Sequence, residues 1–126
     1  MRRAAFDVSS IWPALNAQES SGNYAAVGRQ TKYGQALGGN QLLPGTAKDM
    51  ADKLNLPWRP DLLTDTSPQG KQYQDALGQA YLQQGYDATG NLRDALRYYH
   101  GGPNRGIWGR KTNRYADQIL SRVGNQ

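Results

Sequence analysis

The stretch SSIWPALNAQESSG, residues 9–22, determines the first element of the fold. With the residue before it, its apolar side chains follow the i, i+3, i+4, i+7 spacing of one helix face: Val8, Ile11, Trp12 and Leu15. Pro13 fits such a helix only in the first turn, where its missing N–H has no partner to lose. Gly22 supplies a stop signal. We therefore predict an amphipathic helix from about Ser9 to Ser20.

Four more helical patterns follow, and no segment alternates like a strand. The expected helices begin at a Thr46 cap with Asp49 in the capping box, at Ser67-Pro68, after Asn91, and near Thr112 or Asn113. Their stop signals are Pro57, Gly85, the GGP of residues 101–103, and Gly124. The expected buried stripes are Ala47, Met50, Ala51 and Leu54; Tyr73, Ala76, Leu77, Ala80 and Tyr81; Leu92, Ala95, Leu96 and Tyr99; and Tyr115, Ala116, Ile119 and Val123. The pattern predicts an all-α fold in one domain, residues 1–126, with one core.

A long loop separates the first two helices. Residues 23–44 contain four glycines and few periodic apolar residues. Ordered loops of this length in small domains usually have a function. We therefore expect this loop to carry binding or catalytic residues.

The composition excludes several kinds of site. The chain has no cysteine and a single histidine, His100, so it has neither a disulfide framework nor a cysteine or histidine cluster for a metal. No run approaches the roughly 20 apolar residues of a membrane span, and no apolar segment follows the basic start as in a signal peptide. We expect no metal, no cofactor and no membrane insertion.

Charge and aromatic content suggest the class of partner. The formal net charge is +5, which suits nucleic acid, an anionic membrane surface or an acidic polymer such as the cell wall. The basic residues do not form a recognition helix, so we expect no nucleic-acid binding. Eight tyrosines and three tryptophans stand against one phenylalanine, a bias that suits half-wet sites such as sugar-binding clefts.

Glu19 lies on the apolar stripe of the first helix, four residues after Leu15 and eight after Ile11. A carboxyl group in that last turn would lie at the rim of the core, where partial burial raises its pKa. A protonated carboxyl near neutral pH can donate to a glycosidic oxygen. The alternative is a solvated side chain, because Glu is rarely buried.

Three ordered blocks resemble the soluble lytic transglycosylase family, which is related to goose-type lysozyme. Residues 19–23, ESSGN, resemble its E-S block, and residues 38–47, GGNQLLPGTA, resemble its G-L-M-Q-L-M-P-x-T-A block. Residues 98–103, YYHGGP, resemble its A-Y-N-A-G-P block, and residues 112–115 resemble its closing segment. The chain departs from the pattern at Gly39-Asn40, where an apolar pair is common, and at His100, where Asn is usual.

The resemblance implies a lysozyme-like helical fold and a role for each matched residue. Glu19 would be the catalytic acid/base. The implied substrate-binding residues are Gln41 beside the scissile bond, Leu43 lining the cleft, Tyr99 approaching Glu19, Tyr115 closing the cleft, and Thr31 near a family Ser that contacts the muramyl N-acetyl group. His100 would satisfy its helix end or contact substrate. Tyr24, Tyr33 and Trp108 are candidates for sugar stacking, whereas Trp12 and Trp58 are expected in the core.

The implied activity is cleavage of the β-1,4 bond between N-acetylmuramic acid and N-acetylglucosamine in peptidoglycan, with a 1,6-anhydro product. The alternatives are a hydrolase of goose-lysozyme type and an inactive wall-binding module. The short chain and the YHGGP block also resemble phage-borne members of the family. We therefore expect a domain carried in a virion that acts on the host cell wall, as a monomer when isolated.

Overall fold

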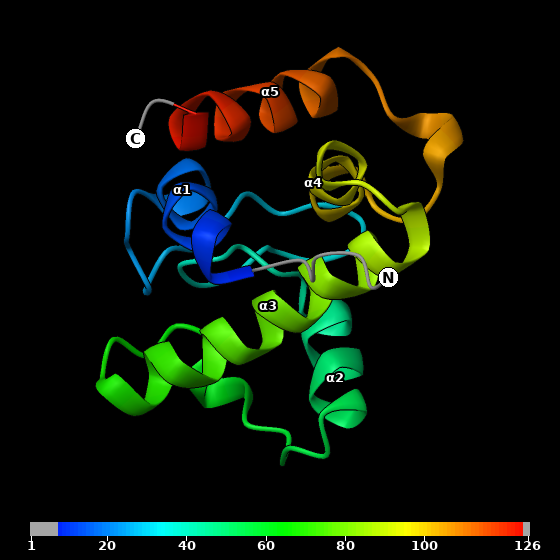
Figure 1. Ribbon diagram of the computed structural model, residues 1–126. Coiled ribbons are helices and arrows are strands. Elements are labelled where there is room, and N and C mark those ends of the chain that lie inside the picture. The colour runs from blue at the N-terminus through cyan, green and yellow to red at the C-terminus, as the bar shows by residue number, and fades with distance from the viewer. Residues whose placement is uncertain (1–7, 125–126) are drawn as a thin grey trace, which may run out of the picture. The chain divides into compact units, whose positions relative to one another are not determined.

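The computed structural model describes residues 8–124, and its elements are helical (Figure 1). In chain order they are α1 (Val8–Ser20), α2 (Pro44–Lys53), the 3-10 turn η1 (Pro60–Leu62), α3 (Pro68–Thr89), α4 (Leu92–Gly101), the 3-10 turn η2 (Arg105–Ile107) and α5 (Arg110–Gly124). Within the described range there is no strand, only isolated antiparallel bridges in the loop after α1. The all-α prediction is confirmed. Across residues 8–124 no helix is both long and apolar enough to cross a bilayer.

Two helix starts are set by side chains, as predicted. Asn91 precedes α4, and its side-chain oxygen accepts a hydrogen bond from the backbone N–H of Asp94 at 2.9 Å. Ser67 precedes α3 and accepts from the N–H of Gly70 at 3.1 Å. Each bond satisfies one of the N–H groups that have no partner within the first turn of a helix.

The predicted start of α2 is wrong. The helix begins at Pro44 with Leu43 as its N-cap, and no side chain caps it. Proline fits this first position because its φ angle is already helical and its N–H is not needed. Thr46 therefore lies inside the first turn. The helix ends at Lys53, which leaves Leu54 41% exposed instead of on the buried stripe.

Two other breakers do not act as expected. α3 continues through Gly85 to Thr89, because the Tyr98 ring packs where a side chain at residue 85 would lie: a Cβ there would be 2.9 Å from Tyr98 Cδ1. Pro13 lies in the second turn of α1 and not the first, with its ring exposed. The fifth helix is expected from Thr112 or Asn113, and α5 begins slightly earlier, at Arg110.

Contacts divide the chain into two compact units. Unit 1 combines the N-terminal part through Ala14 with the chain from Leu82 onward, and unit 2 is Leu15–Tyr81. The backbone of α1 and that of α3 each cross the boundary. The prediction of one domain with one core stays a prediction.

Each unit has its own set of buried apolar side chains. In unit 1 they include Ile11, Trp12, Leu82, Ala95, Leu96, Tyr98, Tyr99, Tyr115, Ala116 and Ile119. In unit 2 they include Leu15, Leu42, Ala47, Met50, Ala51, Leu62, Leu63, Tyr73, Leu77 and Tyr81. Within unit 1, α4 and α5 pack on each other (Figure 1). Trp12 is in the core as predicted, whereas Trp58 is only half-buried.

Candidate active site

Glu19 is the one glutamate in the sequence, and it lies in the last turn of α1 within unit 2. Its side chain is half-buried, in agreement with its place at the end of the apolar stripe. The helix stops directly after it, because Ser21 and Gly22 adopt left-handed φ angles of 55° and 83°. The residue thus stands where the helix gives way to the long loop.

The loop segment Gly38–Gln41 is bonded to the end of α1. The carbonyl oxygen of Gly39 accepts from Asn16 Nδ2 at 3.1 Å and from Ser20 Oγ at 2.7 Å. Gly39 is required by close approach, because a Cβ there would lie 2.9 Å from the Asn16 amide and from the Tyr24 ring. The donors are the helical neighbours of Glu19, so the loop is fixed to the turn that carries it.

The same segment is bonded to α3 by Gln74, a polar side chain only 4% exposed. Its Oε1 accepts from the backbone N–H of Gly39 at 2.9 Å. Its Nε2 donates to three carbonyl oxygens, those of Tyr24, Leu62 and Asp65. Gln74 thus joins separate loop segments of unit 2 through one buried amide.

Gln41 follows in a strained backbone conformation, with φ of 53°. Left-handed φ angles are uncommon for residues with a side chain. Its Nε2 donates to the carbonyl oxygen of Gly38 at 2.9 Å and, more weakly, to that of Ala26 at 3.4 Å. Its Oε1 lies above Gly28, where a Cβ would approach it to 3.0 Å. The nitrogen therefore holds the amide over the loop, and the oxygen lies close to Gly28.

The other predicted site residues of unit 2 already have structural contacts. The Thr31 hydroxyl donates to the Gly34 carbonyl at 2.7 Å and accepts from the Tyr33 N–H, so it closes a tight turn. Leu43 is the half-buried N-cap of α2. Tyr33 at the loop tip is 69% exposed, with Lys32 Nζ 5.1 Å from the ring centroid. Of these side chains, Tyr33 presents the most open surface.

Tyr24 is tied to Asp75 on α3. Its hydroxyl donates to Asp75 Oδ1 at 2.9 Å, and Lys71 lies over its ring at 5.5 Å. Burial, reinforced by the hydrogen bond to Asp75 and by the negative charge of that carboxylate, raises the pKa of the Tyr24 phenol to about 12. The phenol therefore stays protonated and acts as a hydrogen-bond donor.

The predicted residues of the third and last blocks lie in unit 1. Tyr99 on α4 is 7% exposed and meets Trp12 edge-on, with ring centroids 6.4 Å apart. His100 stacks on Tyr115 of α5 at 4.7 Å, and its Nδ1 shares a hydrogen bond of 2.9 Å with the Thr112 hydroxyl. The predicted approach of Tyr99 to Glu19 would join the two units, and it stays a prediction.

His100 is exposed as a residue, but its imidazole is sheltered by these contacts. Burial of the ring, and then the positive charge of Lys111, lower the pKa of His100. The imidazole is therefore neutral at neutral pH. A neutral ring can accept or donate a hydrogen bond, as an amide does, which suits its place where the family has Asn.

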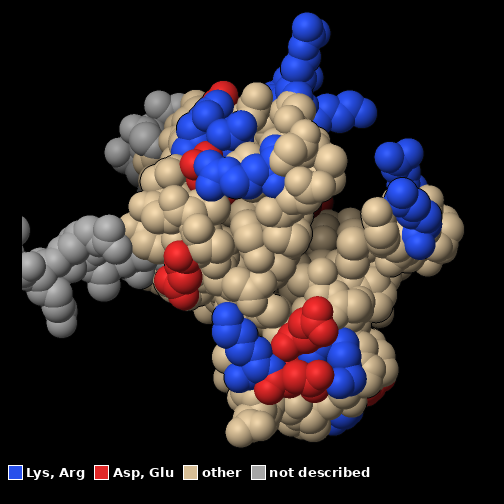
Figure 2. All heavy atoms as spheres, turned by 90° about the vertical axis from the view of Figure 1, so that its right-hand side faces the viewer, with Lys and Arg blue, Asp and Glu red and all other residues tan. Residues whose placement is uncertain are grey.

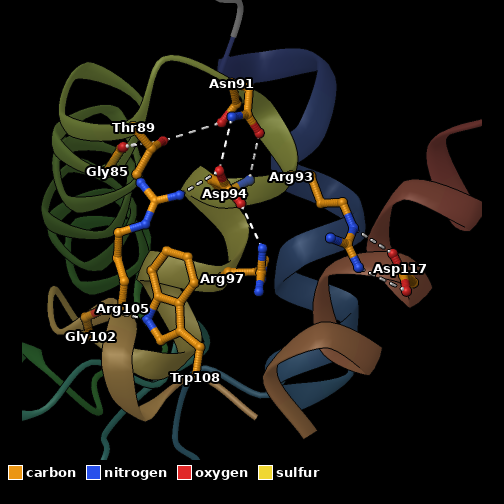
Figure 3. Close-up of polar contacts among 10 residues, drawn as sticks. All are labelled: Gly85, Thr89, Asn91, Arg93, Asp94, Arg97, Gly102, Arg105, Trp108 and Asp117. Carbon is orange, nitrogen blue, oxygen red and sulfur yellow. Dashed lines mark hydrogen bonds and ion pairs between the residues drawn. The ribbon is translucent and has the colours of Figure 1, made fainter. Parts of the chain in front are cut away.

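The YHGGP block is fixed in unit 1 by Trp108 (Figure 3). The indole Nε1 donates to the Gly102 carbonyl at 2.9 Å. The guanidinium groups of Arg97 and Arg105 lie 4.8 and 5.1 Å from the indole centroid, and Figure 3 shows the indole between them. Both guanidinium groups also pair with the carboxylate of Asp94, at 2.8 and 2.9 Å. The indole of Trp108 thus already has structural contacts, and sugar stacking by this residue stays a prediction.

The remaining aspartates of unit 2 have evident structural roles, apart from the exposed Asp49. Asp52 pairs with Lys48 and Asp61 pairs with Arg59. Asp65 accepts from the backbone and hydroxyl of Ser67, which lowers the pKa of that carboxyl. Asp75 accepts from Tyr24 and from the Asn40 side chain. Glu19 differs from these aspartates in combining a half-buried side chain with a place in the last turn of a helix.

Sequence patterns did not identify four residues of this site: Asn16, Asn40, Gln74 and Asp75. Asn16, Gln74 and Asp75 lie outside every motif. The hydrogen bonds from Asn16 to Asn40, from the Gly39 N–H to Gln74 and from Asn40 to Asp75 span 24 to 35 residues of sequence. The one available signal was the departure from the family pattern at Asn40. A polar residue in an expected apolar position implies a polar partner elsewhere in the chain.

Basic side chains lie in separate groups on the face shown in Figure 2, and acidic side chains accompany some of them. Within residues 8–124, ion pairs join several charged side chains, among them Arg93 with Asp117 on neighbouring helices of unit 1. This scatter differs from the continuous basic stripe of a nucleic-acid-binding domain.

Comparison with known proteins identifies the family of the chain. The family model described as Transglycosylase SLT domain matches residues 7–121. A protein named "Transglycosylase" from Enterobacteria phage PRD1 is 32% identical over 105 residues, which are 83% of this chain. The match covers 33% of the phage protein, so the chain spans about a third of that relative's length. The chain therefore belongs to the SLT transglycosylase family, and its described residues form the all-α fold expected from that resemblance.

Proposed function

We propose that this domain cleaves the β-1,4 bond between N-acetylmuramic acid and N-acetylglucosamine in peptidoglycan and forms 1,6-anhydromuramic ends. Glu19 is the single acid/base in this proposal. The observation that carries it is the half-buried position of the chain's one glutamate at the end of α1, beside the loop that holds Gln41. Membership of the SLT family supports the substrate class.

The chemistry needs one carboxyl group because the substrate supplies the nucleophile. Protonated Glu19 gives its proton to the glycosidic oxygen, and the bond from that oxygen to muramyl C1 breaks. The resulting carboxylate then removes the proton of the muramyl C6 hydroxyl, whose oxygen attacks C1 and closes the anhydro ring. Glu19 is protonated again at the end, so atoms and charges balance. Ordinary glycosidases need a second carboxylate, and the structural contacts of Asp52, Asp61 and Asp75 support a mechanism without one.

The substrate contacts in this proposal follow the family resemblance. In unit 2, Gln41 Oε1 accepts a hydrogen bond from the sugar, while Leu43, Thr31 and Tyr24 line the approach. The same resemblance assigns substrate contacts to Tyr99, His100 and Tyr115 of unit 1. The neutral imidazole of His100 supports a hydrogen-bonding role for it and not a second acid/base role.

The test is the Glu19→Gln variant on purified peptidoglycan, with the released fragments identified by mass spectrometry. The variant should release on the order of a thousandfold less product, because proton transfer by one positioned group typically supplies ~10²–10⁴-fold in rate. Asp49→Asn is the matched control, because it neutralises an exposed carboxyl of unit 2 and should leave the rate unchanged. Fragments from the wild type should carry anhydro ends.

Three results would contradict the proposal. An equally active Gln variant removes Glu19 from the mechanism. Reducing ends in place of anhydro ends identify a hydrolase of the goose-lysozyme type. Binding to peptidoglycan without any released product identifies a wall-binding module.

The relative from phage PRD1 supports a phage source for this chain. In this proposal the domain is carried in a virion, acts on the host cell wall, and works as a monomer without a cofactor. Its partners are the glycan strands of peptidoglycan.

A further inference from the structure

A chain of hydrogen-bonded side chains crosses unit 2 from α1 to α3. Asn16 Nδ2 donates to Asn40 Oδ1 at 2.9 Å, and Asn40 Nδ2 donates to Asp75 Oδ1 at 2.9 Å. Asn40 is only 2% exposed, so water cannot readily replace either partner. Asn40 directly precedes Gln41, and Asn16 precedes Glu19 by about one helical turn.

The carboxylate of Asp75 sets the donor-to-acceptor direction of these hydrogen bonds. An ionised carboxylate only accepts hydrogen bonds, so Asn40 must present its nitrogen to Asp75 and its oxygen to Asn16. The Tyr24 hydroxyl donates to the same Oδ1 atom of Asp75, which therefore accepts from both the phenol and the Asn40 amide. The charge at residue 75 therefore selects one of the two orientations of the buried Asn40 amide.

That orientation matters for the geometry of the loop. With its oxygen toward α1, Asn40 accepts from the Asn16 side-chain amide. The same amide also donates to the Gly39 carbonyl oxygen, which accepts from the Ser20 hydroxyl as well. The next residue, Gln41, holds a φ angle of 53°, a conformation that persists only where the surroundings fix it. Loss of the Asn40 bonds would leave buried polar groups without partners and release this segment.

We infer that Asn40 and Asp75 are positioning residues that clamp the loop segment Gly38–Gln41 to the last turns of α1, so that Gln41 and Glu19 are held in one arrangement for catalysis. The inference rests on the proposed function for its catalytic part. Neither residue touches the reacting atoms in this scheme; both act through Asn16 and the loop. The pair also explains why this chain has a buried Asn where its family commonly has an apolar residue.

The test is an exchange of the two groups. Asn40→Asp alone places two carboxylates in contact and should lower kcat on the order of 100-fold with KM within about twofold, because the loop is released while most substrate contacts remain. The exchanged pair, Asn40→Asp with Asp75→Asn, again provides one carboxylate and one amide. The carboxylate now at position 40 can accept from Asn16 and from the amide now at position 75. The oxygen of that amide can accept from Tyr24, so kcat should return to within about threefold of the wild type.

A second readout does not depend on activity. Backbone hydrogen exchange at Gly39 and Gln41 should rise on the order of tenfold in Asn40→Asp and return to the wild-type rate in the exchanged pair. Asp87→Asn is the control, because it neutralises an exposed aspartate on the same helix whose side chain accepts from Gln83. It should change neither kcat nor the exchange rates at the loop.

The outcomes separate this inference from the proposed function. An Asn40→Asp variant with wild-type kcat and exchange rates overturns the clamp, as does an exchanged pair that folds but remains as slow as the single variant. If the single variant does not fold, recovery of both folding and kcat in the exchanged pair supports the clamp. A wild type that releases no anhydro product overturns the proposed function, and the exchange rates then still test the clamp.

Discussion

Two loops are fixed to helices by side chains, residues 38–41 in unit 2 and residues 102–109 in unit 1. The first is held by buried amides: Asn40 and Gln74 are 2% and 4% exposed, and Asp75 is the charged member of the set. The second is held by charged and aromatic groups around Trp108, whose partner Arg105 has a side chain that is 57% exposed. Each loop includes part of a block that the family resemblance identified, residues 38–47 for the first and residues 98–103 for the second.

The two chemistries differ in how much each contact stabilises the loop. A buried amide that loses its partner suffers the full cost of desolvation, so each bond of the first loop is expensive to break. An exposed ion pair or cation–π contact is replaced by water and salt at little cost. The loop beside Glu19 is therefore fixed firmly, whereas the loop after α4 is held by contacts that are individually weak.

The largest effect on stability is expected at Gln74. Gln74→Leu keeps the volume but removes the acceptor for the Gly39 N–H and the donors to three carbonyl oxygens. The free energy of unfolding should fall by about 3–5 kcal/mol, as measured by urea denaturation. Gln83→Leu is the matched control on the same helix, since that amide bonds to an exposed aspartate, and it should cost less than about 0.5 kcal/mol. Equal losses would show that the first loop is no more firmly held than the surface.

An intermediate effect is expected at Gly101, where the second loop packs on α4. A Cβ at this position would lie 2.7 Å from Trp108 Cδ1 and 3.1 Å from the Thr112 hydroxyl. Gly101→Ala should lower the free energy of unfolding by about 1–3 kcal/mol through overpacking. In a Trp108→Leu background the same change should cost much less, because the indole is gone. Gly109→Ala, with open space around the new methyl group, is the control. A full penalty without the indole would contradict this account of the packing.

Local signals predicted much of the fold. Asn91 and Ser67 each cap the helix that follows by accepting from the backbone N–H three residues further on. The evidence for each cap therefore lies within one short segment of sequence. The helix stop expected at Gly85 is wrong because its explanation lies in another element of the fold. Its helix continues because the Tyr98 ring, from the next helix of the chain, packs against the space that the glycine leaves. A breaker residue cannot reveal such a partner by itself.

The candidate site shows the same limit. Glu19 could be selected because helical periodicity placed it on the apolar stripe. The clamp could not be predicted, since the partner of Asn40 lies 35 residues away and carries no motif of its own. The aromatic residues are equally dependent on context. Tyr33 and Trp108 both looked suited to sugars, but one is 69% exposed and the other is flanked by two guanidinium groups.

The smallest effect is expected at Arg105, and it should depend on salt. Its guanidinium pairs with Asp94 and lies over Trp108, but much of the side chain is in water. Arg105→Ala should lower the free energy of unfolding by about 0.5–1 kcal/mol at low ionic strength. At about 1 M salt the Debye length falls to about 3 Å, so at least half of that loss should disappear.

Arg114→Ala on α5 is the control for the removal of an exposed arginine, and its effect should be near zero at both salt concentrations.

Acid provides a second check on the pairing of Arg105 with Asp94. The hydrogen bond from Asn91, together with Arg97 and Arg105, lowers the pKa of Asp94. Its contribution is therefore present above the ordinary aspartate pKa of about 3.9 and is lost as the pH falls through the lower folded value. The penalty of Arg105→Ala should shrink over that same acid range. A penalty that persists in both salt and acid would mean that Arg105 acts by packing on the indole and not by charge.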